Sequence, residues 1–224
     1  MTAAAIGKPA PRLLTWLVSL IVPVVLVLTG VRLLLTPAFV RLEYAQPGFP
    51  ADPFGFTTEE RIHWADVALE YLLNDAGIEF LGDLQFEDGS PLYNQRELGH
   101  MLDVKIVVQR ALAVWYILLA ALVIFGLWAY FGRWWADFRL ALARGGWLTL
   151  GLIGVILLLV LVAWSFFFVF FHEVFFESGT WTFLFSDTLI RLFPERFWQT
   201  AFVSVALFAG LGGLLLALLF RRRA

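Results

Sequence analysis

The sequence predicts an all-α membrane protein with four transmembrane helices, N-in/C-in, and a small extracytoplasmic α+β segment between spans 1 and 2. Of its 224 residues, 61% are hydrophobic, whereas soluble domains are about 45–50% apolar. Four apolar stretches also reach the roughly 20 residues that cross a bilayer. These expected spans are approximately residues 13–35, 104–131, 147–171 and 197–220. We treat residues 1–224 as a single membrane domain.

The first apolar stretch, residues 13–35, is expected to be a retained helix. It is too long for the apolar core of a signal peptide, and no small-residue cleavage site follows it. Pro23 lies in its middle and predicts a bend, because proline cannot donate the backbone hydrogen bond of a helix interior.

The distribution of charge predicts the orientation. Three short segments hold eight Lys or Arg against one acid, and these are residues 1–12, 132–146 and 221–224. Residues 36–103 instead hold three Arg against thirteen Asp or Glu. Cytoplasmic loops carry the excess of Lys and Arg. Both termini and the middle loop are therefore expected in the cytoplasm, and residues 36–103 and 172–196 outside it.

Residues 36–103 form the only sizeable aqueous segment, near the lower length limit for an independent core. Thr57 and Glu60 have the spacing of a capping box at the start of a helix. Residues 78–93 favour short strands, with a turn at Asp88-Gly89-Ser90-Pro91. Asn94 is typical of an N-cap, so a helix is expected to begin there and to continue into the second span.

The second outer segment, residues 172–196, is also expected to hold structure. Asp187 favours the start of a short amphipathic helix, and Pro194 marks its end. Such a helix would lie flat in the membrane interface.

Two histidines are the best candidates for chemistry. His100 stands just before the second span and His172 just after the third, so antiparallel spans would bring both imidazoles to one membrane surface. The chain has no cysteine, which excludes disulfides, cysteine metal sites and thioester intermediates. Asp103 shares a helical stripe with His100. We expect it to bond one ring nitrogen and thereby to set the tautomer.

The structural interpretation of these residues remains open. A single interfacial histidine is usually a polar residue at a helix end, and for the pair the structural and functional interpretations are evenly balanced. His63, in a water-facing helix, is expected to be incidental. Lys105 and Arg110 are ionisable groups within a span, which are rare and usually functional, although Lys105 is near enough to the surface to snorkel.

Two runs of residues resemble signatures of a known family. The first run is Phe86-Glu87-Asp88-Gly89-Ser90-Pro91-Leu92-Tyr93, followed by Glu97, His100-Met101 and Asp103-Val104-Lys105. The second is His172-Glu173-Val174-Phe175-Phe176, then Trp181, Asp187-Thr188-Leu189-Ile190, Leu192-Phe193-Pro194 and Phe197-Trp198. In order and position they are similar to the lipoprotein intramolecular transacylase family of bacterial integral membrane proteins, over roughly residues 84–198.

The resemblance implies a membrane acyltransferase. Such enzymes move an acyl chain from the sn-2 oxygen of a lipoprotein's diacylglyceryl group to the amine of its N-terminal cysteine, giving an N-acyl lyso-lipoprotein. The family's two key histidines map onto His100 and His172. The implied partners are a diacylated lipoprotein and membrane lipid, with no nucleic acid. The implied location is the bacterial cytoplasmic membrane, with the site on the extracytoplasmic side.

We expect substrate contacts from five residues, namely Asp103, Lys105, Arg110, Phe175 and Trp181. Lys105 or Arg110 is the expected oxyanion or head-group ligand. No cofactor and no metal are expected, because an acid and a base suffice for amine attack on an ester.

Two alternatives stay open. A metal-dependent membrane lipid hydrolase would use His100, His172 and an acid as ligands, but the chain has no HExxH-type pair. A non-catalytic lipoprotein-binding accessory protein would share the topology and tolerate loss of either histidine. A transporter is disfavoured because the sequence shows no internal repeat.

Overall fold

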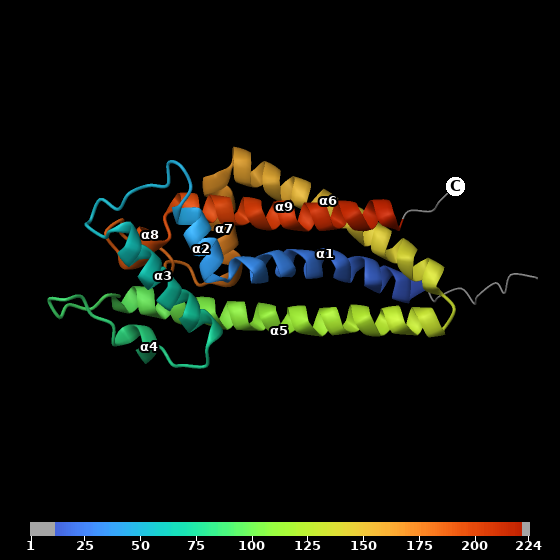
Figure 1. Cartoon of the computed structure of the whole chain (residues 1–224), viewed down its shortest axis with the longest axis horizontal. Helices are drawn as coiled ribbons and strands as arrows, with labels where there is room; N and C mark the ends of the chain where they lie inside the picture. Colours follow the sequence, from blue (N-terminus) through green and yellow to red (C-terminus); the bar gives the residue numbers. More distant parts are fainter. Residues whose placement is uncertain (1–11, 221–224) are drawn as a thin grey trace, which may run out of the picture. The chain divides into compact units, whose positions relative to one another are not determined.

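The computed structural model describes residues 12–220 (Figure 1). Lys8 and Arg221 to Arg223, which contribute to the predicted orientation, lie outside the described residues. The helices are α1 (Arg12–Leu34), α2 (Pro37–Tyr44), α3 (Thr58–Leu73), α4 (Glu79–Gly82), α5 (Gln95–Phe131), α6 (Trp135–Val162), α7 (Trp164–Phe175), α8 (Thr188–Leu192) and α9 (Glu195–Leu219). No β-strand forms between residues 12 and 220, so the fold is all-helical.

Four of these helices, α1, α5, α6 and α9, are long and apolar enough to cross a membrane. The number of candidate spans therefore equals the number predicted. Pro23 lies within α1 without interrupting it. The predicted middle loop is largely helical, because α6 begins at Trp135, just after Arg133 adopts a left-handed φ of 61°.

The third predicted span, residues 147–171, is not one continuous helix. Instead of one helix over residues 147–171, the chain leaves helical geometry at Ala163 (φ −137°, ψ 48°) and starts the separate helix α7 at Trp164. Neither proline nor glycine occurs near this break, so the local sequence carries no signal for it. The consequence is that His172 lies on a short helix of its own.

The chain divides into two compact units. The first unit comprises the described parts of Met1–Val31, Ala113–Leu158 and Ser204–Ala224. Within it, Gly146 of α6 faces the backbone of α9 so closely that a Cβ would collide with the carbonyl oxygen of Gly213. Ser19 also donates a hydrogen bond across helices to the carbonyl oxygen of Ala141 (3.0 Å). Small residues at close crossings are typical of helix packing in membranes.

The second unit, Arg32–Leu112 with Leu159–Val203, contains both candidate histidines. The two expected helix starts in it are confirmed. Thr57 and Glu60 form a reciprocal capping box at the start of α3. At the start of α5, the Glu97 amide donates to Asn94 Oδ1 (3.0 Å), and the Asn94 amide donates to Glu97 Oε2 (2.8 Å). These caps satisfy amides that have no partner in the first turn.

The α+β character predicted for residues 36–103 is wrong. Between residues 78 and 93 the chain forms the one-turn helix α4 and a single isolated bridge between Gln85 and Pro91. Ile78, Leu81 and Leu84 recur three residues apart and pack into one apolar cluster. That spacing suits a helical turn, whereas the inward residues of a strand recur every two.

The short helix predicted after Asp187 is confirmed as α8, but its expected position in the interface is not. Thr188, Leu189 and Leu192 are buried against protein. The two leucines belong to the same cluster as Tyr71 of α3. Asp187 does not cap the helix, and Glu97 Oε1 accepts the Leu189 amide instead (2.7 Å). α8 is therefore anchored to the start of α5, the helix that carries His100.

Candidate functional site

His172 is held by its own helix. In the last turn of α7, its Nδ1 lies 2.7 Å from the carbonyl oxygen of Phe168. A carbonyl oxygen only accepts hydrogen bonds, so Nδ1 must carry the proton. In the neutral ring, Nε2 then keeps its lone pair and can accept a proton.

Burial lowers the pKa of His172 below its usual value of 6.5. The hydrogen bond to the Phe168 carbonyl acts in the opposite direction but does not offset the loss of water. Desolvation disfavours the charged imidazolium. The ring is therefore neutral at pH 7, in the state that a general base requires.

His100 lies on the second turn of α5, just beyond the Asn94–Glu97 capping box. Its Nδ1 is buried and has no hydrogen-bond partner among residues 12–220. The predicted bond from Asp103 does not form, since no hydrogen bond joins the two side chains in this part of the chain. A shared helical stripe predicts the direction in which a side chain leaves the helix, but it does not predict the hydrogen-bond partner of that side chain.

The two imidazole rings lie beside each other, as the positions of their helices predict. Their centroids are 6.2 Å apart and their planes differ by 24°. This separation leaves room for one small group to contact both rings. His63 is not part of the pair, and its ring contacts Trp64 instead (4.6 Å).

Aromatic side chains surround the histidine pair. The ring of Phe176 lies 4.9 Å from His100 and 5.7 Å from His172, and that of Phe183 lies 5.3 Å from His100. The Phe168 ring is 4.1 Å from His172. Such walls exclude water, which strengthens electrostatic interactions inside the site. Phe176 and Phe183 were not among the predicted contacts, because the many phenylalanines of this chain look alike in the sequence.

Trp181 is the predicted substrate residue that the fold brings to the pair. Its ring lies 4.7 Å from that of His172 at an angle of 33°, and 6.5 Å from that of Phe168. Its Nε1 is buried and has no hydrogen-bond partner within the described chain.

The other predicted substrate residues have different surroundings. Lys105 is 6% exposed, and its Nζ donates to Asn74 Oδ1 (3.1 Å) and to the carbonyl oxygen of Ala76 (2.6 Å). It also lies 4.1 Å from the centre of the Tyr71 ring. Arg110 is exposed and makes no hydrogen bond or ion pair in residues 12–220. Phe175 is 46% exposed, against Phe171 and Phe176.

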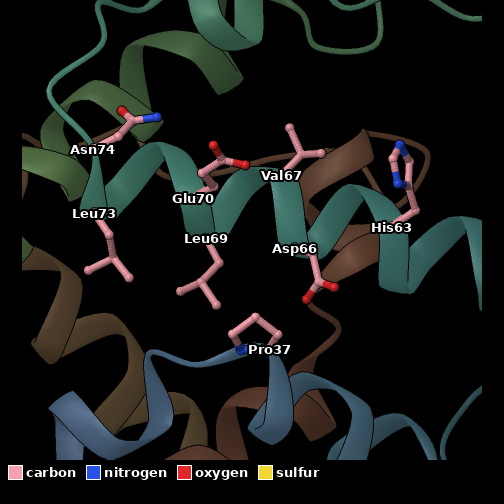
Figure 2. A pocket seen from close by; sticks show the side chains of 8 residues that line it. All are labelled: Pro37, His63, Asp66, Val67, Leu69, Glu70, Leu73 and Asn74. Atoms are coloured by element: carbon pink, nitrogen blue, oxygen red, sulfur yellow. The ribbon is translucent and has the colours of Figure 1, made fainter.

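A separate groove of about 560 Å³ runs along α3 (Figure 2). Figure 2 shows Leu69, Leu73 and Asp66 pointing toward Pro37 on its far wall. None of its lining residues is a predicted site residue. Among the described residues, no three His, Asp or Glu side chains come together in a group that could hold a metal ion.

Comparisons with known proteins identify the family of the chain. A model of the family "Lipoprotein intramolecular transacylase Lit" matches residues 16–198. An uncharacterized protein of Aquifex aeolicus is 29% identical over 209 residues, which cover 91% of each chain. The membrane integral lipoprotein intramolecular transacylase Lit from Bacillus cereus has a TM-score of 0.76 at 22% identity, over 94% of each chain. A variant of that protein with one histidine replaced by alanine has a TM-score of 0.69 at 22% identity, over 94% of this chain and 91% of the other. The chain therefore belongs to the lipoprotein intramolecular transacylase Lit family, and it is a multi-pass membrane acyltransferase.

Proposed function

We propose that the protein moves an acyl chain from the sn-2 oxygen of a diacylated lipoprotein to the amine of that lipoprotein's N-terminal cysteine. The product is an N-acyl lyso-lipoprotein. The observation that carries the proposal is the pair of partly buried imidazoles, His100 and His172, with centroids 6.2 Å apart inside an aromatic wall. Nucleophile and ester belong to one substrate molecule, so the enzyme mainly supplies orientation and proton transfer.

The tautomer of His172 supports a role for this ring in the first proton transfer. As the neutral amine attacks the ester carbon, a C–N bond forms and the C=O electron pair moves onto the carbonyl oxygen. Nε2 of His172 takes the proton that the nitrogen must lose, because Nδ1 is already protonated and donates to Phe168. His172 therefore acts as the general base.

The second proton transfer restores the site. The tetrahedral intermediate collapses, the C–O bond to the sn-2 oxygen breaks, and that oxygen leaves as a hydroxyl with the proton that His172 had taken. His100 is the neighbouring group positioned to bind this oxygen as it leaves, since its Nδ1 has no partner in the described chain. One proton leaves nitrogen and one arrives at oxygen, so both imidazoles end each turnover neutral.

We place the reaction at the extracytoplasmic side of a bacterial cytoplasmic membrane. The support is the charge asymmetry, with eight Lys or Arg against one acid in the three segments assigned to the cytoplasm. Residues 36–103 and 172–196, which carry the two histidines at or near their ends, are the acidic and aromatic outer segments of this arrangement.

Mass spectrometry tests the proposal directly. Purified protein in lipid vesicles is incubated with a synthetic S-(diacylglyceryl)cysteinyl lipopeptide. Intramolecular transfer leaves the mass unchanged, and fragmentation then shows an N-acyl cysteine and a lyso-glyceryl group. A mass decrease by one fatty acid minus one water would indicate a hydrolase, and unchanged fragmentation would indicate the accessory protein.

The histidine variants complete this test. His100→Ala and His172→Ala are each expected to abolish transfer at near-normal expression. His63→Ala, which removes an exposed imidazole away from the pair, is the matched control and should be nearly silent. Full activity of His100→Ala would refute the mechanism.

A further inference from the structure

The indole of Trp181 is fixed in place by the site itself. Its ring stands 4.7 Å from His172, and the Phe168 ring lies edge-on at 6.5 Å with an interplanar angle of 74°. Trp181 belongs to the segment between α7 and α8. The contact therefore joins the aromatic helix of His172 to the segment that follows it.

The Nε1–H group of Trp181 is an unsatisfied donor. It is buried and has no partner among the described residues, whereas Trp115 donates to Thr29 Oγ1 at 2.9 Å. Buried tryptophan N–H groups usually have a partner. A buried donor without one costs about 1–3 kcal/mol. A partner from outside the chain would remove that penalty.

The chemistry of the missing partner follows from the donor. Indole Nε1–H donates and cannot accept, so its partner must be a hydrogen-bond acceptor. A second buried atom without a partner, His100 Nδ1, lies in the other ring beside His172. Both unsatisfied groups therefore belong to rings that lie next to the proposed base.

Lys105, the cation expected to stabilise an oxyanion, already donates hydrogen bonds to other groups. Its Nζ is bonded to Asn74 and Ala76 and lies over the Tyr71 ring. Within residues 12–220, neither Lys105 nor Arg110 makes a hydrogen bond with either histidine of the pair. The donor for the developing negative charge must therefore be another group.

We infer that Trp181 Nε1–H binds the carbonyl oxygen of the acyl group that is transferred, and stabilises the negative charge on it. The inference rests on the proposed acyl transfer. When the amine attacks, the C=O electron pair moves onto this oxygen, and Trp181 keeps its proton throughout. A fixed donor in a water-poor site is effective because no reorganisation is needed as charge develops.

The test removes the N–H and keeps the ring. Trp181 is replaced by β-(3-benzothienyl)alanine, in which sulfur stands where Nε1–H was, and separately by phenylalanine. The same isostere at Trp147, which is 59% exposed, is the control. We expect kcat with the synthetic lipopeptide to fall about 100-fold for the Trp181 isostere, the lower end of the effect of losing one oxyanion donor. KM should stay nearly unchanged, because the interaction strengthens only in the transition state.

The melting temperature separates this role from a structural one. Removing a donor that has no partner in the ligand-free protein should leave the melting temperature unchanged or raise it. Wild-type kcat in the Trp181 isostere, or a loss of activity that follows a loss of thermal stability, would overturn the inference. Failure of the wild-type protein to form the N-acyl product would instead refute the proposed function.

Discussion

The Nδ1 atom of His172 lies 2.7 Å from the carbonyl oxygen of Phe168, one turn earlier in the same helix. This bond does for His172 what Asp103 was expected to do for His100, since it fixes the tautomer and the ring orientation. A backbone carbonyl carries no net charge, so it orients the ring and stabilises the imidazolium less than a carboxylate would. The ring is thus suited to take a proton and to return it.

The first prediction concerns the titration of His172. Because burial lowers its pKa below 6.5, the midpoint of its ring NMR signal should lie below 6.5 in lipid nanodiscs, assigned with His172→Asn. Because the pKa is lower in the folded protein, the unfolded chain binds this proton more readily, and the free energy of unfolding falls as the pH falls. The contribution of the neutral ring is complete above pH 6.5 and is lost as the pH falls toward the folded pKa. A midpoint above 6.5 would contradict a buried neutral base.

The second prediction is that Lys105 stabilises the fold and does not act in catalysis. Lys105→Met would leave the Ala76 carbonyl without its donor, and Asn74 Oδ1 would keep only the Ala76 amide. The expected loss of stability is about 1–3 kcal/mol, with kcat per folded molecule unchanged. Arg110→Met removes an exposed cation and should change stability by less than about 0.5 kcal/mol. If kcat fell while the melting temperature held, the oxyanion role of Lys105 would be restored.

Helix starts could be predicted because capping is local. Thr57 with Glu60, and Asn94 with Glu97, lie three residues apart and carry the signal by themselves. The strands expected over residues 78–93 were wrong because Ile78, Leu81 and Leu84 follow the spacing of a helical turn. The break at Ala163 has no local cause in the sequence.

In the candidate site, too, some features could be predicted from the local sequence and others could not. The approach of His100 and His172 follows from their positions at the ends of neighbouring spans. The pairing of Trp181 with His172 depends on how residues 176–187 return to the bundle, and no spacing rule gives that path. The hydrogen bond from Lys105 to Asn74 likewise joins residues 31 positions apart, and helical periodicity cannot predict a contact at that separation.

The third prediction is topological. Single cysteines can be introduced at positions 60, 140 and 180 because the chain has none of its own. The charge asymmetry predicts that a membrane-impermeant thiol reagent labels positions 60 and 180 in intact cells, and position 140 only after permeabilisation. Labelling of position 140 from outside would invert the arrangement and move the site to the cytoplasmic face.

The fourth prediction is that turnover needs no metal. His172 and Glu173 are adjacent on α7, so their side chains diverge by roughly 100° and cannot easily share an ion. Activity should survive exhaustive treatment with EDTA or phenanthroline, with elemental analysis as the accompanying measurement. Loss of turnover that zinc restores would favour the hydrolase.

The last prediction uses two ion pairs of similar length and different burial. Arg191 Nη2 lies 2.9 Å from Asp52 Oδ2 with side chains 10% and 1% exposed, whereas Arg41 Nη2 lies 2.7 Å from Asp66 Oδ2 with side chains 56% and 24% exposed. Asp52→Asn would leave a buried guanidinium without its anion and should cost about 3–5 kcal/mol. Arg41→Gln should cost at most about 1 kcal/mol.

The buried pair should also make the protein less stable at low pH, which gives the pH profile of stability an acid limb. Burial raises the pKa of Asp52, but the hydrogen bonds from Arg191 and from the Phe56 amide lower it by more, so the net pKa lies below 3.8. This contribution is present above pH 3.8 and is lost as the pH falls toward the folded value. Thermal unfolding in nanodiscs measures both effects, and Asp52→Asn should flatten the acid limb while Arg41→Gln keeps it. Equal losses in the two variants would mean that burial does not decide the strength of these pairs.

Arg191 follows Trp181 in the segment between α7 and α9, so loosening this pair should also lower the activity of the Asp52 variant, whereas the Arg41 variant should remain active.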